Sequence, residues 1–187
     1  MPSPIDVPEL VARALDLSRQ RGFITSTRHE TGRLLAALAA SRTGRLAELG
    51  TGTGVGSAWL ASGAPEDARI VSAELDPALA EEVQRIFADV ESIEIVSGDW
   101  TAIETHAPFS LVFVDVREVM AEIDHLADLL EPGGIAVLDD FTPSPHWPPI
   151  VDGQVDSIRE QWLTDERFVA VEMLIDEGAS LVIATRR

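Results

Sequence analysis

The sequence holds one segment whose composition indicates a ligand-binding loop, ELGTGTGVGS, which runs from Glu48 to Ser57 directly behind a short apolar run. Glycine loses more conformational freedom on folding than any other residue, so its density here indicates a backbone that adopts positive φ or approaches a bulky ligand closely. A tight turn that merely requires glycine is the alternative. The glycines of the segment are Gly50, Gly52, Gly54 and Gly56.

Two common phosphate-binding patterns fit this segment poorly. The dinucleotide fingerprint needs glycines at positions i, i+2 and i+5. Counted from Gly50 the last position is Val55, and counted from Gly52 it is Ser57. The P-loop pattern needs a lysine, which the segment lacks. The pattern that fits is acid-x-Gly-x-Gly-x-Gly, beginning at Glu48.

Strand and helix patterns alternate along the chain and would position this loop. Apolar runs typical of strands buried in a parallel sheet lie at 45–49, 69–74, 93–96, 110–114 and 134–138. Helical patterns fill most of the gaps, among them a helix that begins at Asp76 and Pro77 and an apolar stripe over 119–130. The segments FVAVEMLI and SLVIATRR flank residues 176–179 and predict an antiparallel hairpin. We therefore predict an α/β fold with a doubly wound, mostly parallel, Rossmann-like sheet of about seven strands.

Two helices are predicted before the first strand. Residues 6–20 carry a helical apolar stripe, and Thr27 with Glu30 matches a capping box that would begin the second helix. A further helix is predicted around Ile158 and Trp162. We expect a single domain over 1–187, in which 1–42 form the N-terminal helices and 43–187 form the α/β core.

Composition excludes several classes of function. The net charge is −18, and the Lys and Arg residues are scattered, which argues against a nucleic-acid partner. No apolar run approaches the roughly 18 residues of a membrane span, and the N-terminus lacks the basic start of a signal peptide, so we expect a cytoplasmic protein without a membrane partner. The absence of cysteine excludes disulfides, thiolate metal sites and a thiol nucleophile.

Three motifs together resemble the class I S-adenosylmethionine-dependent methyltransferases: ELGTGTG, AELDP at 73–77 and SGDW at 97–100. In a doubly wound sheet the ligand lies outside the carboxyl ends of the strands, where the glycine loop is expected. The resemblance implies that S-adenosylmethionine binds there, with Glu74 on the ribose hydroxyls. For Asp76 we prefer a helix-capping role. The implied cofactor-binding set is Glu48, Gly50, Gly52, Gly54, Gly56, Glu74, Gly98, Asp99, Trp100 and Asp115, with core packing the alternative for Trp100.

Within this class the chain is more similar to the catechol and caffeoyl-CoA type O-methyltransferases. The segments LVFVD, LEPGGIAVLDD and DEGASLVIATRR, among others, follow in the family's order. The resemblance implies methyl transfer to a small catechol-like acceptor, a homodimer, and a divalent cation (Mg²⁺, Mn²⁺ or Ca²⁺) on Asp115, Asp139 and Asp140. The chain departs from the family where Asp140 replaces an amide and Glu118 replaces a lysine. The alternative is that Asp139 and Asp140 hydrogen-bond the backbone of a loop.

The candidate catalytic residues are Asp115, Glu118 and His146. His146 and Trp147 lie in a proline-rich stretch, 141–153, which we expect to cover the mouth of the crevice, although a surface loop without a role is equally compatible. A long apolar N-terminal helix also favours a homodimer. Two other classes of function stay open: a nucleotide-dependent oxidoreductase and a non-catalytic cofactor-binding module.

Overall fold

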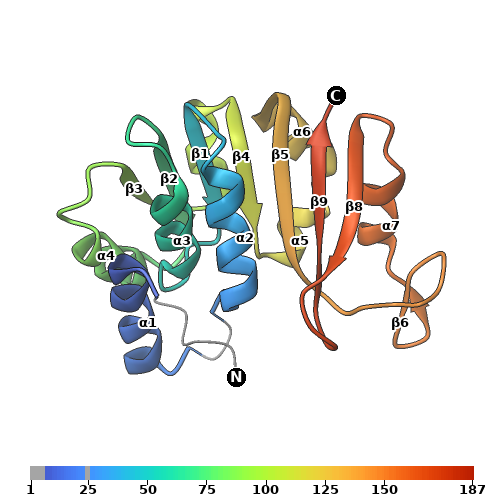
Figure 1. Ribbon diagram of the computed structural model, residues 1–187, viewed down its shortest axis with the longest axis horizontal. Helices are drawn as coiled ribbons and strands as arrows, with labels where there is room; N and C mark the ends of the chain where they lie inside the picture. The colour runs from blue at the N-terminus through green and yellow to red at the C-terminus, as the bar shows by residue number, and fades with distance from the viewer. Residues whose placement is uncertain (1–6, 24–25) are drawn as a thin grey trace.

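The computed structural model describes residues 7–23 and 26–187 and confirms the predicted sheet. Seven strands form one sheet in the order β3-β2-β1-β4-β5-β9-β8 (Figure 1). The first five strands of the chain are parallel, and β9 pairs antiparallel with both β5 and β8. The strands are β1 (Arg45–Leu49), β2 (Arg69–Glu74), β3 (Ile93–Ser97), β4 (Phe109–Val114), β5 (Leu130–Phe141), β8 (Phe168–Leu174) and β9 (Ser180–Arg186).

The order of the strands creates a crevice at one end of the sheet. From β1 the chain adds β2 and β3 on one side, and it then returns to place β4 on the other side of β1. Connections leave β1 and β4 in opposite directions, so their carboxyl ends face an open space at this switch point. The glycine loop follows β1 and therefore lies at the switch point.

Helices cover both faces of the sheet and create two hydrophobic cores (Figure 1). One core joins the sheet to α1 (Glu9–Arg21), α2 (His29–Ala39), α3 (Val55–Gly63) and α4 (Pro77–Ile86). The other joins it to the 3₁₀ helix η1 (Trp100–His106), α5 (Arg117–Met120), α6 (Ile123–Leu129) and α7 (Ser157–Thr164).

The central strand β4 explains why these strands read as continuous apolar runs. All six of its residues are buried. Leu111 and Phe113 pack into one core, whereas Val112 and Val114 pack into the other. A strand covered on both faces has no polar side, so its sequence does not alternate.

Four local predictions need correction. The predicted capping box is absent, because α2 follows Arg28 and no side chain caps it. The stripe over 119–130 belongs to two helices, α5 and α6, rather than one. The fifth strand is longer than 134–138 and spans Leu130–Phe141. The proline-rich stretch leads into a short hairpin of β6 (Ile150–Val151) and β7 (Gln154–Val155). Residue 6 of the first predicted helix lies outside the described residues.

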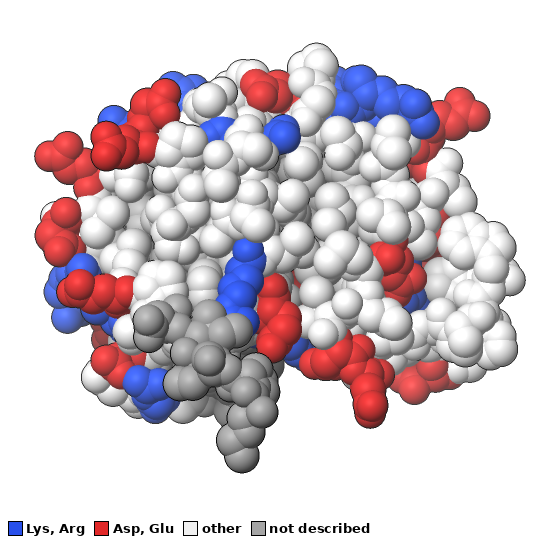
Figure 2. All heavy atoms as spheres, in the orientation of Figure 1, with Lys and Arg blue, Asp and Glu red and all other residues white. Residues whose placement is uncertain are grey.

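The surface carries its charges in a dispersed form. On the face drawn in Figure 2, acidic and basic groups alternate around the margins, and the basic groups form small separate clusters. None of the helices within 7–23 and 26–187 combines the length and the apolar character that crossing a bilayer requires.

Candidate functional site

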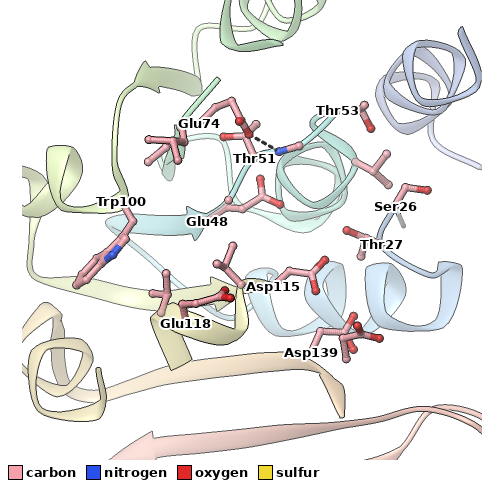
Figure 3. A pocket seen from close by; sticks show the side chains of 18 of the residues that line it. Ser26, Thr27, Glu48, Thr51, Thr53, Glu74, Trp100, Asp115, Glu118 and Asp139 are labelled. Carbon is pink, nitrogen blue, oxygen red and sulfur yellow. Dashed lines mark hydrogen bonds between the residues drawn. The ribbon is translucent and has the colours of Figure 1, made fainter. Parts of the chain in front are cut away.

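A cavity of about 900 Å³ opens at the switch point, between the carboxyl ends of the strands and the segment that precedes α2 (Figure 3). Eleven of the residues singled out from the sequence line this one cavity. They are Glu48, Gly50, Gly52, Glu74, Gly98, Asp99, Trp100, Asp115, Glu118, Asp139 and Asp140. Residues far apart in the chain are therefore brought together as the parallel topology requires.

The glycine loop is fixed to the end of β2 by a small hydrogen-bond network. The backbone N–H groups of Gly50 and Thr51 donate to the Ala73 carbonyl at 3.1 and 3.0 Å. The Glu74 carboxylate accepts from the Gly52 N–H at 2.8 Å, drawn in Figure 3, and from the Asp76 N–H at 2.9 Å. Glu74 is thus held at the cavity wall, where its carboxylate has further lone pairs that can accept hydrogen bonds. Asp76 caps α4 as predicted, accepting from Ala78 N–H at 2.9 Å.

Gly54 and Gly56 do not line the cavity, although the sequence suggested that they contact the cofactor. Gly54 has φ +82°, and a Cβ there would lie 2.8 Å from both Val83 of α4 and Phe87, the residue after α4. At Gly56 a Cβ would overlap the Glu48 carboxyl group. These two glycines permit close packing behind the loop rather than contact with a ligand.

Glu48 is a buried carboxyl group directly beneath the loop. It is 2% exposed and accepts hydrogen bonds from Ser57 and from Ser72, the latter at 3.1 Å. Burial raises the pKa of Glu48 to about 8, although the two serine hydroxyl groups act to lower it. The free protein therefore holds a proton on Glu48 at neutral pH.

Asp115 and Asp139 form a pair of acids at the ends of β4 and β5. Burial, together with the nearby Asp139 and Asp140 charges, raises the pKa of Asp115 to about 7. Burial also raises the pKa of Asp139, which is 2% exposed. In the part of the chain that the structure describes, Asp139 Oδ1 is buried without a hydrogen-bond partner.

The three aspartates predicted as metal ligands are not arranged as a ligand set. Asp140 has φ 68°, its side chain is 70% exposed, and its Oδ1 atom lies 3.4 Å from Arg28 Nη1. Among the described residues, no group of three or more His, Cys, Asp or Glu side chains is placed to hold a metal ion. The donor geometry of the described residues therefore does not fit the cation that the resemblance implied.

The candidate bases Glu118 and His146 lie in different parts of the structure. Glu118, at the start of α5, lines the cavity. His146 and Trp147 do not line it, and both are exposed, with Trp147 63% accessible. The stretch that carries them is tied toward α7 instead, through the Asp156 N–H bond to the Pro149 carbonyl. The expectation that this stretch covers the crevice mouth is not supported by its position.

Asp99 and Trp100 also line the cavity, and Figure 3 shows Trp100 on the opposite side from Asp139. The Asp99 carboxylate caps η1 by accepting from the Thr101 N–H at 3.1 Å. Trp100 is half-buried, packs against the core and meets His125 edge-on at 4.6 Å between ring centroids. Trp100 therefore contributes both to packing and to the cavity wall.

Sequence reasoning missed the cavity residues that precede α2 and one that precedes α6. These are Phe23, Ser26, Thr27, Arg28 and Glu122. The capping-box interpretation of Thr27 concealed its position on the cavity wall. No local pattern marks the others, because the cavity is closed by tertiary packing of a loop against strand ends.

Comparisons with known proteins agree with this geometry. Residues 47–141 match the methyltransferase domain family. A protein of Mycobacterium tuberculosis described as a probable O-methyltransferase is 30% identical over 118 residues, covering 57% of this chain and 52% of that protein. The chain thus spans about half the length of the curated relatives it matches.

Solved structures share the whole fold. The O-methyltransferase TomG from Streptomyces achromogenes, in complex with S-adenosylmethionine, has a TM-score of 0.77 at 23% identity, covering 98% of this chain and 92% of that chain. An O-methyltransferase from Bacillus cereus, in complex with S-adenosylhomocysteine, has a TM-score of 0.77 at 19% identity, covering 99% and 94%. With a cavity at the switch point, a glycine loop beside a fixed carboxylate and a family match over half its length, the chain belongs to the methyltransferase domain family, in the class I S-adenosylmethionine-dependent fold.

Proposed function

We propose that the protein is an S-adenosylmethionine-dependent O-methyltransferase that acts on a small hydroxylated, catechol-like acceptor. The observation that carries the proposal is the Glu74 carboxylate, fixed by Gly52 N–H at 2.8 Å and by Asp76 N–H, beside a glycine loop at the switch point. Two adjacent ribose hydroxyl groups need such an acceptor. The relatives described as O-methyltransferases support the choice of oxygen as the methylated atom.

Some cavity residues would bind the cofactor, and others would remove the proton from the acceptor. Glu74 would accept hydrogen bonds from the ribose, and Trp100 would pack against the adenine. The bound cofactor supplies the methyl group: a bond forms from the acceptor oxygen to the methyl carbon as the sulfur–carbon bond breaks, leaving S-adenosylhomocysteine. Asp115 or Glu118, which both line the cavity, would take the proton from the acceptor hydroxyl. The chain would mainly hold this oxygen in line with the methyl group.

The test is cofactor binding by the full chain, measured by calorimetry. Glu74→Ala leaves hydroxyl groups unpaired in the complex and should cost about 1 to 3 kcal/mol of binding free energy. Glu160→Ala, on α7 and outside the cavity, is the matched control and should bind like the unchanged protein. Equal affinity of both variants would remove Glu74 from the cofactor site, and no binding by the unchanged chain would overturn the proposed function.

Metal assistance through Asp115, Asp139 and Asp140 would need these side chains to move, because they do not form a ligand set in the described residues. Its direct test is calorimetric titration of Mg²⁺ or Mn²⁺ into the cofactor-loaded protein, with Asp139→Asn alongside. Saturable binding by the unchanged chain that is lost in Asp139→Asn would establish the site. Absence of binding would leave the acids to serve another role.

A further inference from the structure

Beyond the glycine loop the wall of the cavity is strongly acidic. Carboxyl groups reach it from the ends of β4 and β5, from α5 and from the residue before α6. Figure 3 shows Asp115, Glu118 and Asp139 on the side of the cavity that lies away from Glu74. Arg28 is the one basic side chain among the described residues that line the cavity. The acids on this wall, called here the acidic wall, are Asp115, Glu118, Glu122, Asp139 and Asp140.

Among the described residues, four of the five acids form no ion pair. Arg28 pairs with Asp140 at 3.4 Å and with Asp176 at 3.7 Å, both largely exposed. Within 7–23 and 26–187, no ion pair reaches the other members of the acidic wall, which are Asp115, Glu118, Glu122 and Asp139. The Thr31 hydroxyl and the more distant Arg28 charge act to lower the pKa of Asp139, but burial outweighs them.

Elsewhere in the molecule, several acids pair with arginine. Arg21 binds Glu82, and Arg159 binds Glu172 at 2.7 Å. Arg117, the immediate neighbour of Glu118, turns away from the cavity and binds Asp156. The chain contains no lysine that could substitute. Any basic partner for the acidic wall would therefore be an arginine, and among the described residues only Arg28 lines the cavity.

One oxygen of the acidic wall is buried without a hydrogen-bond partner among the described residues. Asp139 is 2% exposed and lines the cavity, yet its Oδ1 atom is buried without a hydrogen-bond partner among the described residues. A buried carboxylate oxygen without a donor is costly. A ligand that brings a positively charged N–H group to this wall would provide both the donor and the charge.

We propose that the acceptor is an organic cation, a hydroxylated molecule that also carries an amine or guanidinium group, which binds against the acidic wall. This rests on the proposed methyltransferase function and names the substrate class of the same cavity. The cofactor carries two positive groups and one carboxylate, so it compensates one of the four unpaired acids at most. Acceptors with phosphate or carboxylate groups, including acyl-coenzyme A thioesters, would meet like charge and bind poorly.

The test uses three phenols that differ only in the charge of the side chain: tyramine (positive), 4-ethylphenol (neutral) and 4-hydroxyphenylacetate (negative). Each is titrated by calorimetry at neutral pH, with chelator present, into the full chain saturated with S-adenosylhomocysteine. Monophenols cannot chelate a metal through adjacent hydroxyl groups, so the comparison isolates charge. We expect tyramine to bind at least about tenfold more tightly than 4-ethylphenol, and 4-hydroxyphenylacetate more weakly than both.

Matched variants test whether the charge of the acidic wall causes the preference for tyramine. Glu118→Gln and Glu122→Gln keep the shape of the side chain and should each reduce the preference for tyramine over 4-ethylphenol severalfold. Glu94→Gln, on the exposed side of β3 and outside the cavity, removes the same charge and should leave the preference unchanged. Loss of binding of all ligands in one variant would indicate that this variant is misfolded. The preference for tyramine in the other variant then tests the inference.

Equal affinity for the three phenols, tightest binding of the anion, or binding of none of them overturns the inference. Tyramine binding that requires added Mg²⁺ also overturns it, because the metal would then supply the charge. These results differ from failure of the proposed function, in which S-adenosylhomocysteine itself would not bind.

Discussion

Gly56 of α3 lies directly against the carboxyl group of Glu48 on β1, where the space that a Cβ atom would need is occupied by Glu48 Oε1. The glycine motif therefore serves two purposes. Its first half, with Gly50 and Gly52, borders the cavity, and its second half makes room for a buried acid. The position of Glu48 and the packing of α3 are set by the same small residue.

Gly56→Ala should destabilise the fold by about 1 to 3 kcal/mol, because the added methyl group must displace a fully buried side chain. Gly178→Ala is the control: Gly178 has ordinary φ, and an added Cβ there would make a normal contact at 3.5 Å. Urea unfolding of both variants measures the difference. Similar midpoints for the two variants would show that Glu48 can move aside without cost.

Glu48 should make the stability of the free protein depend on pH. Its pKa is about 8 in the folded protein against a usual value of 4.5, so between these values the folded state keeps a proton that the unfolded state has lost. Stability should therefore be greatest below pH 4.5 as far as this group is concerned, and should fall as pH rises toward 8, by up to about 1.4 kcal/mol per pH unit.

The measurement is urea unfolding of the unchanged protein and of Glu48→Gln from pH 5 to pH 8. Glutamine does not titrate, so the variant should lose less stability over this range. Asp115, whose pKa is raised to about 7, has a contribution of the same sign in both proteins and cancels in the comparison. Parallel curves would mean that Glu48 is ionised in the folded state at neutral pH.

Buried and exposed arginines should differ sharply in their contribution to stability. Arg159 is fully buried, where it donates to the Thr142 carbonyl and to Glu172, both at 2.7 Å. Arg159→Met leaves Glu172 and Asp156 without this cation and should cost about 3 kcal/mol or more. Arg167→Met breaks a surface pair with Asp165 and should cost about 1 kcal/mol or less. Equal unfolding midpoints for the two variants would contradict this ranking.

The strands were predictable because their signal is local. The runs at 45–49 and 69–74 coincide with β1 and β2 end to end, since burial on both faces produces a continuous apolar run. The apolar stripe over 119–130 led to a wrong prediction of one continuous helix. Ala121 and Glu122 interrupt the helix without breaking the spacing of the apolar residues. A break of this kind depends on backbone angles that the apolar pattern does not encode.

The site was predictable as a set of strand-end residues but not as a geometry. Parallel topology brings Glu74 and Asp115 to one edge whatever their side chains do. Whether Asp140 joins them depends on its φ of 68°, which turns its side chain toward Arg28 and solvent. Arg28 itself reaches the cavity through the packing of a loop. The direction of single side chains could therefore not be predicted from the sequence.

The last prediction concerns assembly, for which we propose a homodimer. The apolar side of α1, which suggested dimerisation from the sequence, is used within the chain, with Val11, Ala14 and Leu17 buried in one of the two cores. Four of the exposed large apolar residues lie instead on β8, at the edge of the sheet, where Val169 and Val171 are 58% and 54% exposed. A second copy that packs against this strand would cover them.

Light scattering should give twice the 20.2 kDa chain mass for the unchanged protein, and a shift toward 20.2 kDa for Val171→Lys. Val155→Lys is the control, because Val155 is 47% exposed on the separate β6-β7 hairpin and should leave the mass unchanged. If the unchanged protein has a mass of 20.2 kDa at high concentration, the homodimer proposal fails. If Val155→Lys separates the subunits and Val171→Lys does not, the contact lies on the hairpin rather than on β8.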